Sequence, residues 1–303
     1  AYLAAPQAPH PNLAPATTHS YPALSFLLAL PSIWAGLPTL GYMQVAALLA
    51  LIIALIATAP ARLRPIIALL CLLDVDGIRS VASSDFAIWT TAGVALVWLL
   101  AHRKGESWPE IQRQRAPRRG VSRWLAAWRA SQPWLPAIAL GLVCAVQQTA
   151  WFFAPFYLVW VWRTYDLQRV LREGGVAVGA FLLVNLPWIV SATGPWLRSL
   201  FLPVTLPLFP TGGGLVGLGL GGALPLWPPA IYALLEVGAY MGLLALYARW
   251  HSRVPLAGLL LPMVALLLAW RSPSRYFILL PFLAIVALVL TLRAAPGGGK
   301  ELS

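Results

Sequence analysis

The chain has 303 residues, of which 60% are hydrophobic and 10% are charged, and its formal net charge is +12. Soluble domains usually carry about 25% charged residues, so a chain this poor in charge cannot cover its surface in water, and a soluble globular domain is excluded. The apolar runs are continuous and do not alternate as the strands of a membrane barrel do. Because backbone groups in lipid must bond within the chain, the sequence predicts an all-α fold, a polytopic transmembrane helical bundle of roughly 8–10 membrane helices.

Residues 1–20 are rich in proline, which does not fit inside a regular helix, and they are predicted to form an outer N-terminal loop. This segment has no basic region followed by an apolar core, so it does not have the pattern of a signal peptide. The chain begins at Ala1 and not at methionine. We therefore expect a processed chain, or a fragment whose N-terminal part is missing.

Residues 21–293 are predicted to form a single transmembrane bundle. The apolar runs cover 21–38, 42–60, 66–82, 86–101, 134–147, 148–162, 174–192, 229–248, 254–270 and 276–293. The run at 66–82 is weak because acids such as Asp74 interrupt it. The region 134–162 is predicted to break near Gln147 into two short helices that cross and return.

The segment 102–133 carries eight basic residues against two glutamates. Basic loops stay on the cytoplasmic side, which predicts that this loop and the tail 294–303 are cytoplasmic. Alternating the spans from there places 17 of the 21 basic residues inside and four outside. Anionic phospholipid headgroups are the expected partners of the loop. No nucleic acid partner is expected, since the positive charge follows the topology.

The segment 193–228 is apolar but rich in glycine and proline. These residues disfavour helix, so we predict an irregular outer or re-entrant loop, not a stable helix. Its glycines do not indicate a nucleotide site, because no strand precedes them and their spacing fits no phosphate-binding loop.

Acids on the outer side are the first candidates for chemistry. Asp85 opens the run at 86–101, where it is either an N-terminal cap of the helix or part of a site. Asp74 either pairs with Arg79 or lines a cavity. Glu236 lies inside an apolar run, and an acid inside a membrane segment is a candidate site residue.

The stretch RSPSRYF, residues 271–277, separates two apolar runs on the predicted outer side. Arginine binds phosphate oxygens through its planar fork of donors. Arg271 and Arg275 are therefore predicted either to hold a lipid-linked phosphate or to reach ordinary phospholipid headgroups.

Other polar residues have two interpretations each. Gln147, Gln148 and Thr149 lie at the predicted helix break and either bond between helices or contact a substrate. His19 and Tyr21 lie in the outer loop, as substrate contacts or as solvated residues. The sequence holds no Ser/His/Asp triad signature, metal-ligand cluster or ATP-binding motif, so we expect no metal or cofactor and an activated substrate or a gradient as the source of energy.

The order of these features resembles the GT-C superfamily of membrane glycosyltransferases, and most of all its polyprenol-phosphate-sugar-dependent bacterial enzymes around glycosyltransferase family 87. The matching pieces are HSYPALSFLLALP from His19, SSDFAIW around Asp85, GLVCAVQQTAWFFAPFYLVWVWR at 141–163 and RSPSRYFILLP at 271–281. The resemblance covers about residues 15–295, and the order and sidedness of the motifs carry it, since each motif is weak alone.

The resemblance implies a hexosyltransferase in a bacterial plasma membrane that transfers a sugar from a polyprenyl-phosphate donor on the non-cytoplasmic face. It implies that Asp85 assists catalysis and that the substrate is bound by six residues. These are Arg271, Arg275, Tyr276, Gln148, His19 and Tyr21. The family's main catalytic acid is expected in an earlier loop, and residues 1–21 hold no Asp or Glu, so that base is predicted to be absent from this chain.

Two alternatives remain open from the sequence. A transporter or lipid flippase would use the interrupted segment 193–228 and the membrane acids, although no internal repeat relates the two halves of the chain, as it does in many transporters. A non-catalytic membrane scaffold is the other alternative, because the expected acid is absent.

Overall fold

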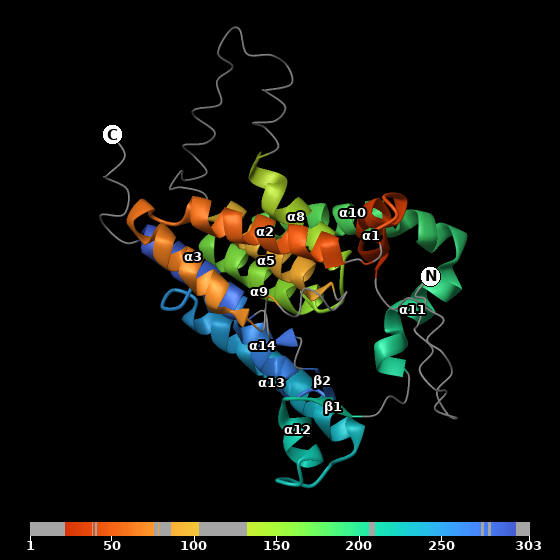
Figure 1. The fold of residues 1–303 in the computed structure, drawn as a ribbon. Coiled ribbons are helices and arrows are strands. Elements are labelled where there is room, and N and C mark those ends of the chain that lie inside the picture. Colours follow the sequence, from red (N-terminus) through yellow and green to blue (C-terminus); the bar gives the residue numbers. More distant parts are fainter. Residues whose placement is uncertain are drawn as a thin grey trace.

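The fold of the chain is described by a computed structural model, shown in Figure 1. The structure describes residues 22–37, 39, 41–75, 78, 86–102, 132–205, 210–273, 276–277 and 280–294. Within these residues almost all regular structure is helical, apart from one parallel pair of two-residue strands. The prediction of an all-α fold is therefore confirmed.

The helices follow one another along the chain with short connections. The α-helices are α1 (Ala23–Trp34), α2 (Gly41–Thr58), α3 (Arg64–Leu73), α5 (Ala87–Ala101), α8 (Leu135–Cys144), α9 (Ala150–Thr164), α10 (Leu167–Ser191), α11 (Thr193–Thr205), α12 (Leu215–Leu220), α13 (Pro229–Trp250), α14 (Leu261–Leu266) and α15 (Leu280–Ala294). The short 3₁₀ helices are η1 (Ala61–Leu63), η2 (Gln132–Trp134) and η3 (Ala257–Leu259), and the strands are β1 (Thr211–Gly212) and β2 (Arg271–Ser272).

Two predicted boundaries differ from the structure. The break near Gln147 is confirmed, since α8 ends at Cys144 and α9 begins at Ala150. The predicted continuous run at 254–270 is wrong, because it forms only η3 and α14. Pro262 begins α14, where its missing N–H costs no bond, and a proline there cannot continue an earlier helix.

The prediction that 193–228 holds no stable helix is also wrong. This segment contains α11 and α12, with β1 between them. Pro195 is tolerated because it lies in the first turn of α11, where backbone N–H groups have no partner within the helix. Helix α11 starts one residue after α10 ends, and Trp196 N–H donates to Ala192 C=O at 2.9 Å, so the turn continues across the junction.

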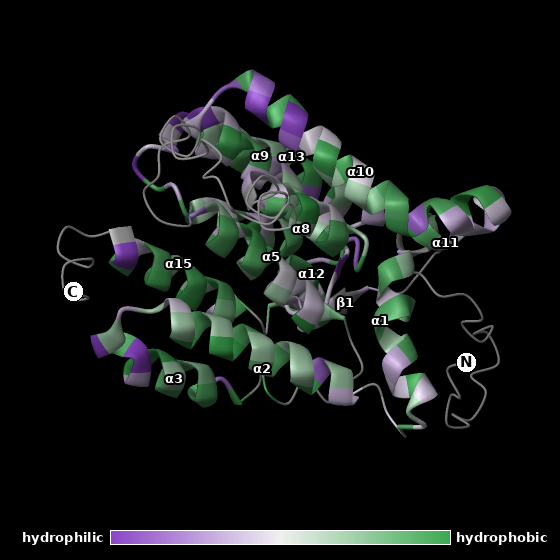
Figure 2. Ribbon diagram, turned by 90° about the horizontal axis from the view of Figure 1, so that it is seen from above, coloured by the Kyte–Doolittle hydropathy of each residue, from purple (hydrophilic) through white to green (hydrophobic). Residues whose placement is uncertain are grey.

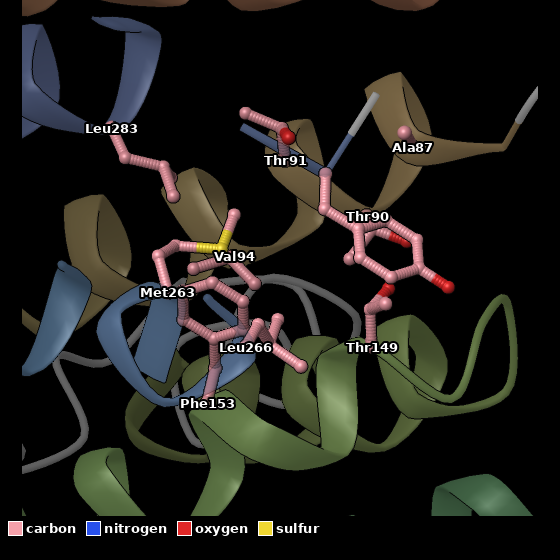
Figure 3. Close-up of a pocket in the computed structure, with 10 residues that line it drawn as sticks. Ala87, Thr90, Thr91, Val94, Thr149, Phe153, Met263, Leu266 and Leu283 are labelled. Atoms are coloured by element: carbon pink, nitrogen blue, oxygen red, sulfur yellow. The ribbon is translucent and has the colours of Figure 1, made fainter. Parts of the chain in front are cut away.

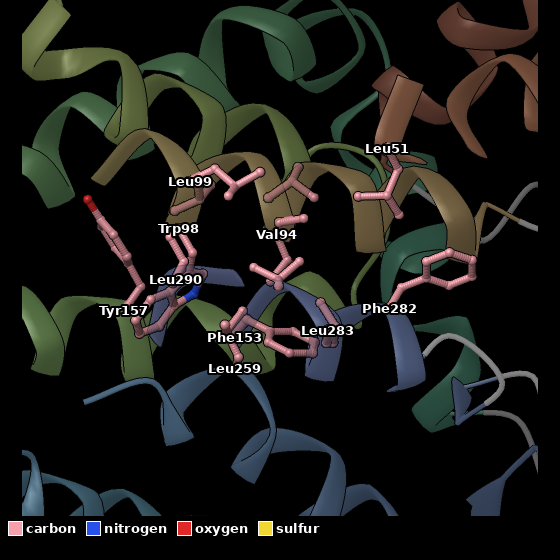
Figure 4. Packing of buried hydrophobic residues seen from close by; sticks show 14 of the residues in the cluster. Leu51, Val94, Trp98, Leu99, Phe153, Tyr157, Leu259, Phe282, Leu283 and Leu290 are labelled. Atoms are coloured by element: carbon pink, nitrogen blue, oxygen red, sulfur yellow. The ribbon is translucent and has the colours of Figure 1, made fainter. Parts of the chain in front are cut away.

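The core lies around α5, which packs against α2, α8 and α15. Figure 4 shows Val94 and Trp98 of α5 facing Phe153 and Tyr157 of α9. Trp98 is 1% exposed and its ring meets Tyr157 edge-on at 6.1 Å. Large aromatic side chains thus fill the space between α5 and α9 and bury much area for few residues.

Three helices, α2, α10 and α13, are long and apolar enough to cross a membrane. Their outer faces carry large apolar side chains that no part of the described structure covers: Leu183, Val190 and Leu234 are 77%, 74% and 74% exposed. Figure 2 shows these hydrophobic surfaces along the helices. Such surfaces are favourable in lipid and unfavourable in water, and they indicate a membrane protein.

The two ends of the bundle differ in composition. At one end, called the basic end below, lie the α2–α3 turn, the C-terminal ends of α5 and α15, the α9–α10 turn and the turn after α13 (Figure 1). These segments carry most of the described arginines: Arg62, Arg64, Arg163, Arg169, Arg172, Arg249, Arg253 and Arg293. The opposite end holds the start of α5, the α8–α9 turn, α12 and the β1–β2 pair. The charge pattern therefore predicted correctly which segments share an end.

Candidate functional site

Three of the predicted site residues lie in the described part of the chain: Gln148, Arg271 and Tyr276. All three are at the opposite end of the bundle from the basic end. Asp85, Arg275, His19 and Tyr21 lie outside the described residues, as do Asp76 and Arg79. Glu236 is half-buried on α13.

A small cavity lies where three of the predicted segments meet. It is lined by Ala87, Thr90, Thr91, Val94, Thr149, Phe153, Met263, Leu266, Tyr276 and Leu283. Figure 3 shows Thr90 and Thr149 on one side of it and Met263 and Phe153 on the other. Its volume of about 20 Å³ has room for about one water molecule. Tyr276, from the RSPSRYF stretch, is thus brought beside the start of α5 and the helix break.

The helix break is tied to α5 by a buried side-chain hydrogen bond. Thr90 Oγ1 donates to Gln147 Oε1 at 2.9 Å, and both side chains are nearly fully buried. The sequence interpretation of this pair of glutamines as partners of another helix is confirmed for Gln147. The bond fixes the α8–α9 turn against the start of α5, which carries two threonines of the cavity.

Gln148 points toward a different element. Its Nε2 donates to the backbone carbonyl of Leu200, in α11, at 3.2 Å. This bond joins the helix break to the segment that follows α10. The amide of Gln148 therefore positions α11, and a role in substrate binding would require this bond to open.

Strands β1 and β2 clamp two distant segments together. Thr211 pairs with Arg271 and Gly212 with Ser272, and Gly213 N–H donates to Ser272 C=O at 2.9 Å. Gly212 has φ of +134°, and a Cβ there would lie 1.8 Å from Ser272 O. Only glycine permits this backbone conformation and this close approach, which explains the glycine run that the sequence left unassigned.

Two buried donors at this clamp have no acceptor among the described residues. They are Nε of Arg271 and the hydroxyl of Ser272. Ser272 is fully buried, and its Oγ lies beside Gly214, whose added Cβ would come within 2.8 Å. Leaving a buried donor without an acceptor costs about 1–3 kcal/mol, so these two groups mark a place where an oxygen-rich ligand would be favourable.

Asn185 was not singled out from the sequence, although a polar residue in the run 174–192 was the available signal. It is fully buried on α10. Its Oδ1 accepts a hydrogen bond from Ala23 N–H at 3.0 Å, and its Nδ2 donates to Phe181 C=O at 2.9 Å. Asn185 therefore satisfies a backbone N–H at the start of α1, which has no partner within that helix, and holds α1 against α10.

Among the described residues, no group of three or more His, Cys, Asp or Glu side chains could hold a metal ion. Both cysteines are free thiols, with Cys71 buried in α3 and Cys144 at the end of α8. The chemistry available at this end of the bundle is therefore that of arginine, hydroxyl and amide groups, together with any acid near the start of α5.

Comparisons of the chain with protein-family models, with curated proteins and with solved structures find no match.

The bond between α5 and the helix break can be tested by a double-mutant cycle. Thr90→Val and Gln147→Leu are each expected to destabilise the protein, with a coupling energy of about 1 kcal/mol, as for hydrogen bonds between membrane helices. The measurement is the free energy of unfolding in mixed detergent micelles. Thr91→Val, at the neighbouring threonine of the same cavity, is the control and should show no coupling to Gln147→Leu. Additive effects of Thr90→Val and Gln147→Leu would show that the bond contributes nothing.

Proposed function

We propose that the chain is part of a polytopic membrane glycosyltransferase that transfers a hexose from a polyprenyl-phosphate donor on the non-cytoplasmic face. The observation that carries the proposal is the pair of buried donors at β2, Arg271 Nε and Ser272 Oγ, which have no acceptor in the described part of the chain. A phosphate group supplies the oxygens that such donors need, and guanidinium–phosphate hydrogen bonds are strong because both groups are charged.

The surroundings of these donors support a phosphate-bearing ligand. The β1–β2 clamp places glycine backbone against Ser272, so the segment lacks side chains that would block a close approach. Tyr276, a few residues further along, lines the cavity formed with Thr90 and Thr149. That cavity is too small for a sugar, so in this proposal it receives at most one hydroxyl group, and the sugar lies beyond its rim.

The reaction follows from these placements. The acceptor hydroxyl oxygen attacks C1 of the sugar, the bond between C1 and the phosphate oxygen breaks, and polyprenyl phosphate leaves. Arg271 stabilises the charge that develops on the leaving phosphate. A carboxylate removes the proton of the acceptor hydroxyl. Asp85 directly precedes α5, whose Ala87 and Thr90 line the cavity, and it assists; the main base belongs to an earlier loop.

The test replaces Arg271 in the full-length gene product. Arg271→Gln is expected to lower kcat/KM for a polyprenyl-phosphate hexose on the order of a hundredfold, because one charged donor to the leaving group is lost. Arg271→Lys keeps the charge but loses the planar fork and should fall between the two. The measurement is transfer of labelled hexose in membrane vesicles.

Arg198→Gln is the control, because Arg198 is an exposed arginine on α11 at the same end of the bundle. It should leave transfer unchanged. Unchanged kinetics in Arg271→Gln would sink the role of Arg271. Movement of the lipid-linked sugar across vesicles without covalent transfer would instead favour the transporter or flippase alternative, and the absence of both activities would favour a scaffold.

A further inference from the structure

The basic end of the bundle has an open hollow lined by three arginines. Arg163 lies in the last turn of α9, Arg249 in the last turn of α13, and Arg253 in the turn that follows. Trp250 and Ser252 complete the polar part of the lining, and the hollow has a volume of about 560 Å³. Residues from two helices that are far apart in sequence thus place three cations around one space.

Helix ends alone account for only part of this arrangement. A cation in the last turn is favourable because it faces the negative end of the helix dipole, which explains Arg163 and Arg249 individually. It does not explain why both line the same hollow with Arg253. Like charges gathered at one place repel one another unless anions lie between them.

No acid in the described part of the chain neutralises the hollow. The ion pair between described side chains joins Arg169 to Glu173, on α10, and none involves Arg163, Arg249 or Arg253. All three arginines are exposed. Burial and, second, the charge of Arg163 lower the pKa of the neighbouring His251, so this histidine stays neutral at physiological pH and adds no further charge.

The position of the hollow indicates the source of the anion. It lies at the end of α13, one of the helices long and apolar enough to cross a membrane, and therefore at headgroup depth if α13 does cross. Trp162 and Trp250 flank it and are 47% and 44% exposed, as is typical of tryptophan at a membrane interface. The guanidinium carbon of Arg163 lies 5.8 Å from the ring centroid of Trp162, which keeps that arginine beside the interfacial ring.

We infer that the hollow formed by Arg163, Arg249 and Arg253 binds the phosphate of an anionic phospholipid headgroup on the cytoplasmic side. The planar donors of arginine suit phosphate oxygens, the tryptophans contact the glycerol and upper acyl region, and Ser252 is available for a headgroup hydroxyl. This site lies at the other end of the bundle from the proposed donor site and does not depend on the proposed function. It is also distinct from diffuse attraction to the loop 102–133.

The test measures lipid binding by native mass spectrometry of the purified chain in detergent micelles, titrated with phosphatidylglycerol or with phosphatidylcholine. Phosphatidylglycerol is expected to bind more tightly. The triple variant Arg163→Gln/Arg249→Gln/Arg253→Gln should weaken its binding by roughly fivefold for each arginine, on the order of a hundredfold together. A triple lysine variant keeps the charge but not the fork and should lose less.

The matched control removes the same charge elsewhere at the basic end, as Arg62→Gln/Arg172→Gln/Arg293→Gln. It should change the binding of phosphatidylglycerol by less than about fivefold, since none of these side chains lines the hollow. Equal loss in both triple variants would overturn the site, because the attraction would then be diffuse. Displacement of phosphatidylglycerol by an equal concentration of inorganic phosphate would overturn the lipid as the source of the phosphate group.

Discussion

Gly141→Ala is expected to force α8 away from α10 and to lower the free energy of unfolding by about 1–3 kcal/mol, the usual cost of overpacking. A Cβ at residue 141 would lie 2.1 Å from Ala177 O and 2.8 Å from Ala180 Cβ. The nearest obstacle is backbone, so it cannot turn aside as a flexible side chain would. Small residues at such crossings allow membrane helices to pack closely, and α8 and α10 form one of the most extensive contacts in the bundle.

Gly179→Ala is the matched control, because Gly179 lies on α10 itself, is exposed and has no heavy atom within 4 Å of an added Cβ. There the methyl group meets no neighbour, and alanine favours helix over glycine by up to about 1 kcal/mol, so the variant should be as stable as the parent or more so. The measurement is unfolding in mixed detergent micelles for both variants. Equal stability of the two variants would contradict the close packing of α8 against α10.

Glu173→Leu is expected to destabilise the protein by about 3–5 kcal/mol, the cost of leaving a partner of a buried ion pair alone. Glu173 is 3% exposed and forms a salt bridge with Arg169. It also accepts a hydrogen bond from the Tyr157 hydroxyl at 2.6 Å. Arg169 in turn donates to Pro133 C=O at 2.9 Å, with its guanidinium 4.9 Å from the Trp134 ring centroid. This network joins α9, α10 and the start of α8 at the basic end.

Two further variants separate charge from shape. Glu173→Gln keeps an oxygen that accepts from Tyr157 but loses the negative charge, so it should cost less than Glu173→Leu. The double variant Arg169→Met/Glu173→Leu removes the cation that would otherwise stay unpaired, and it should recover part of the lost stability. The same unfolding measurement in micelles applies. A double variant no more stable than Glu173→Leu would show that the ion pair is not the source of the effect.

Patterns within single segments predicted much of this molecule. The long apolar runs predicted the positions of α2, α5, α10 and α13, and the polar residues around Gln147 predicted the break between α8 and α9. Helices in 193–228 were not predicted, because the average glycine and proline content hid that Pro195 falls in a first turn, where proline is tolerated.

The candidate site was predicted in part. Arg271 and Tyr276 stood out from the sequence because charged and polar groups are rare in so apolar a chain. Their surroundings could not be predicted: β1 lies about 60 residues before β2, and glycine composition does not say which backbone a glycine will meet. Glu173 and Asn185 were overlooked, since each is one polar residue near a helix whose partner lies on another element.

The sequence by itself determined the class of protein, the helical fold and the sorting of arginine-bearing segments to one end. These depend on the transfer free energy of each residue between water and lipid, which sums along the chain. Only the tertiary structure decided that Thr90 meets Gln147, that β1 closes on Ser272, and that Arg163 and Arg253 share a hollow. Such meetings depend on how helices cross and pack, and side chains close-packed at those crossings select partners that no single segment encodes.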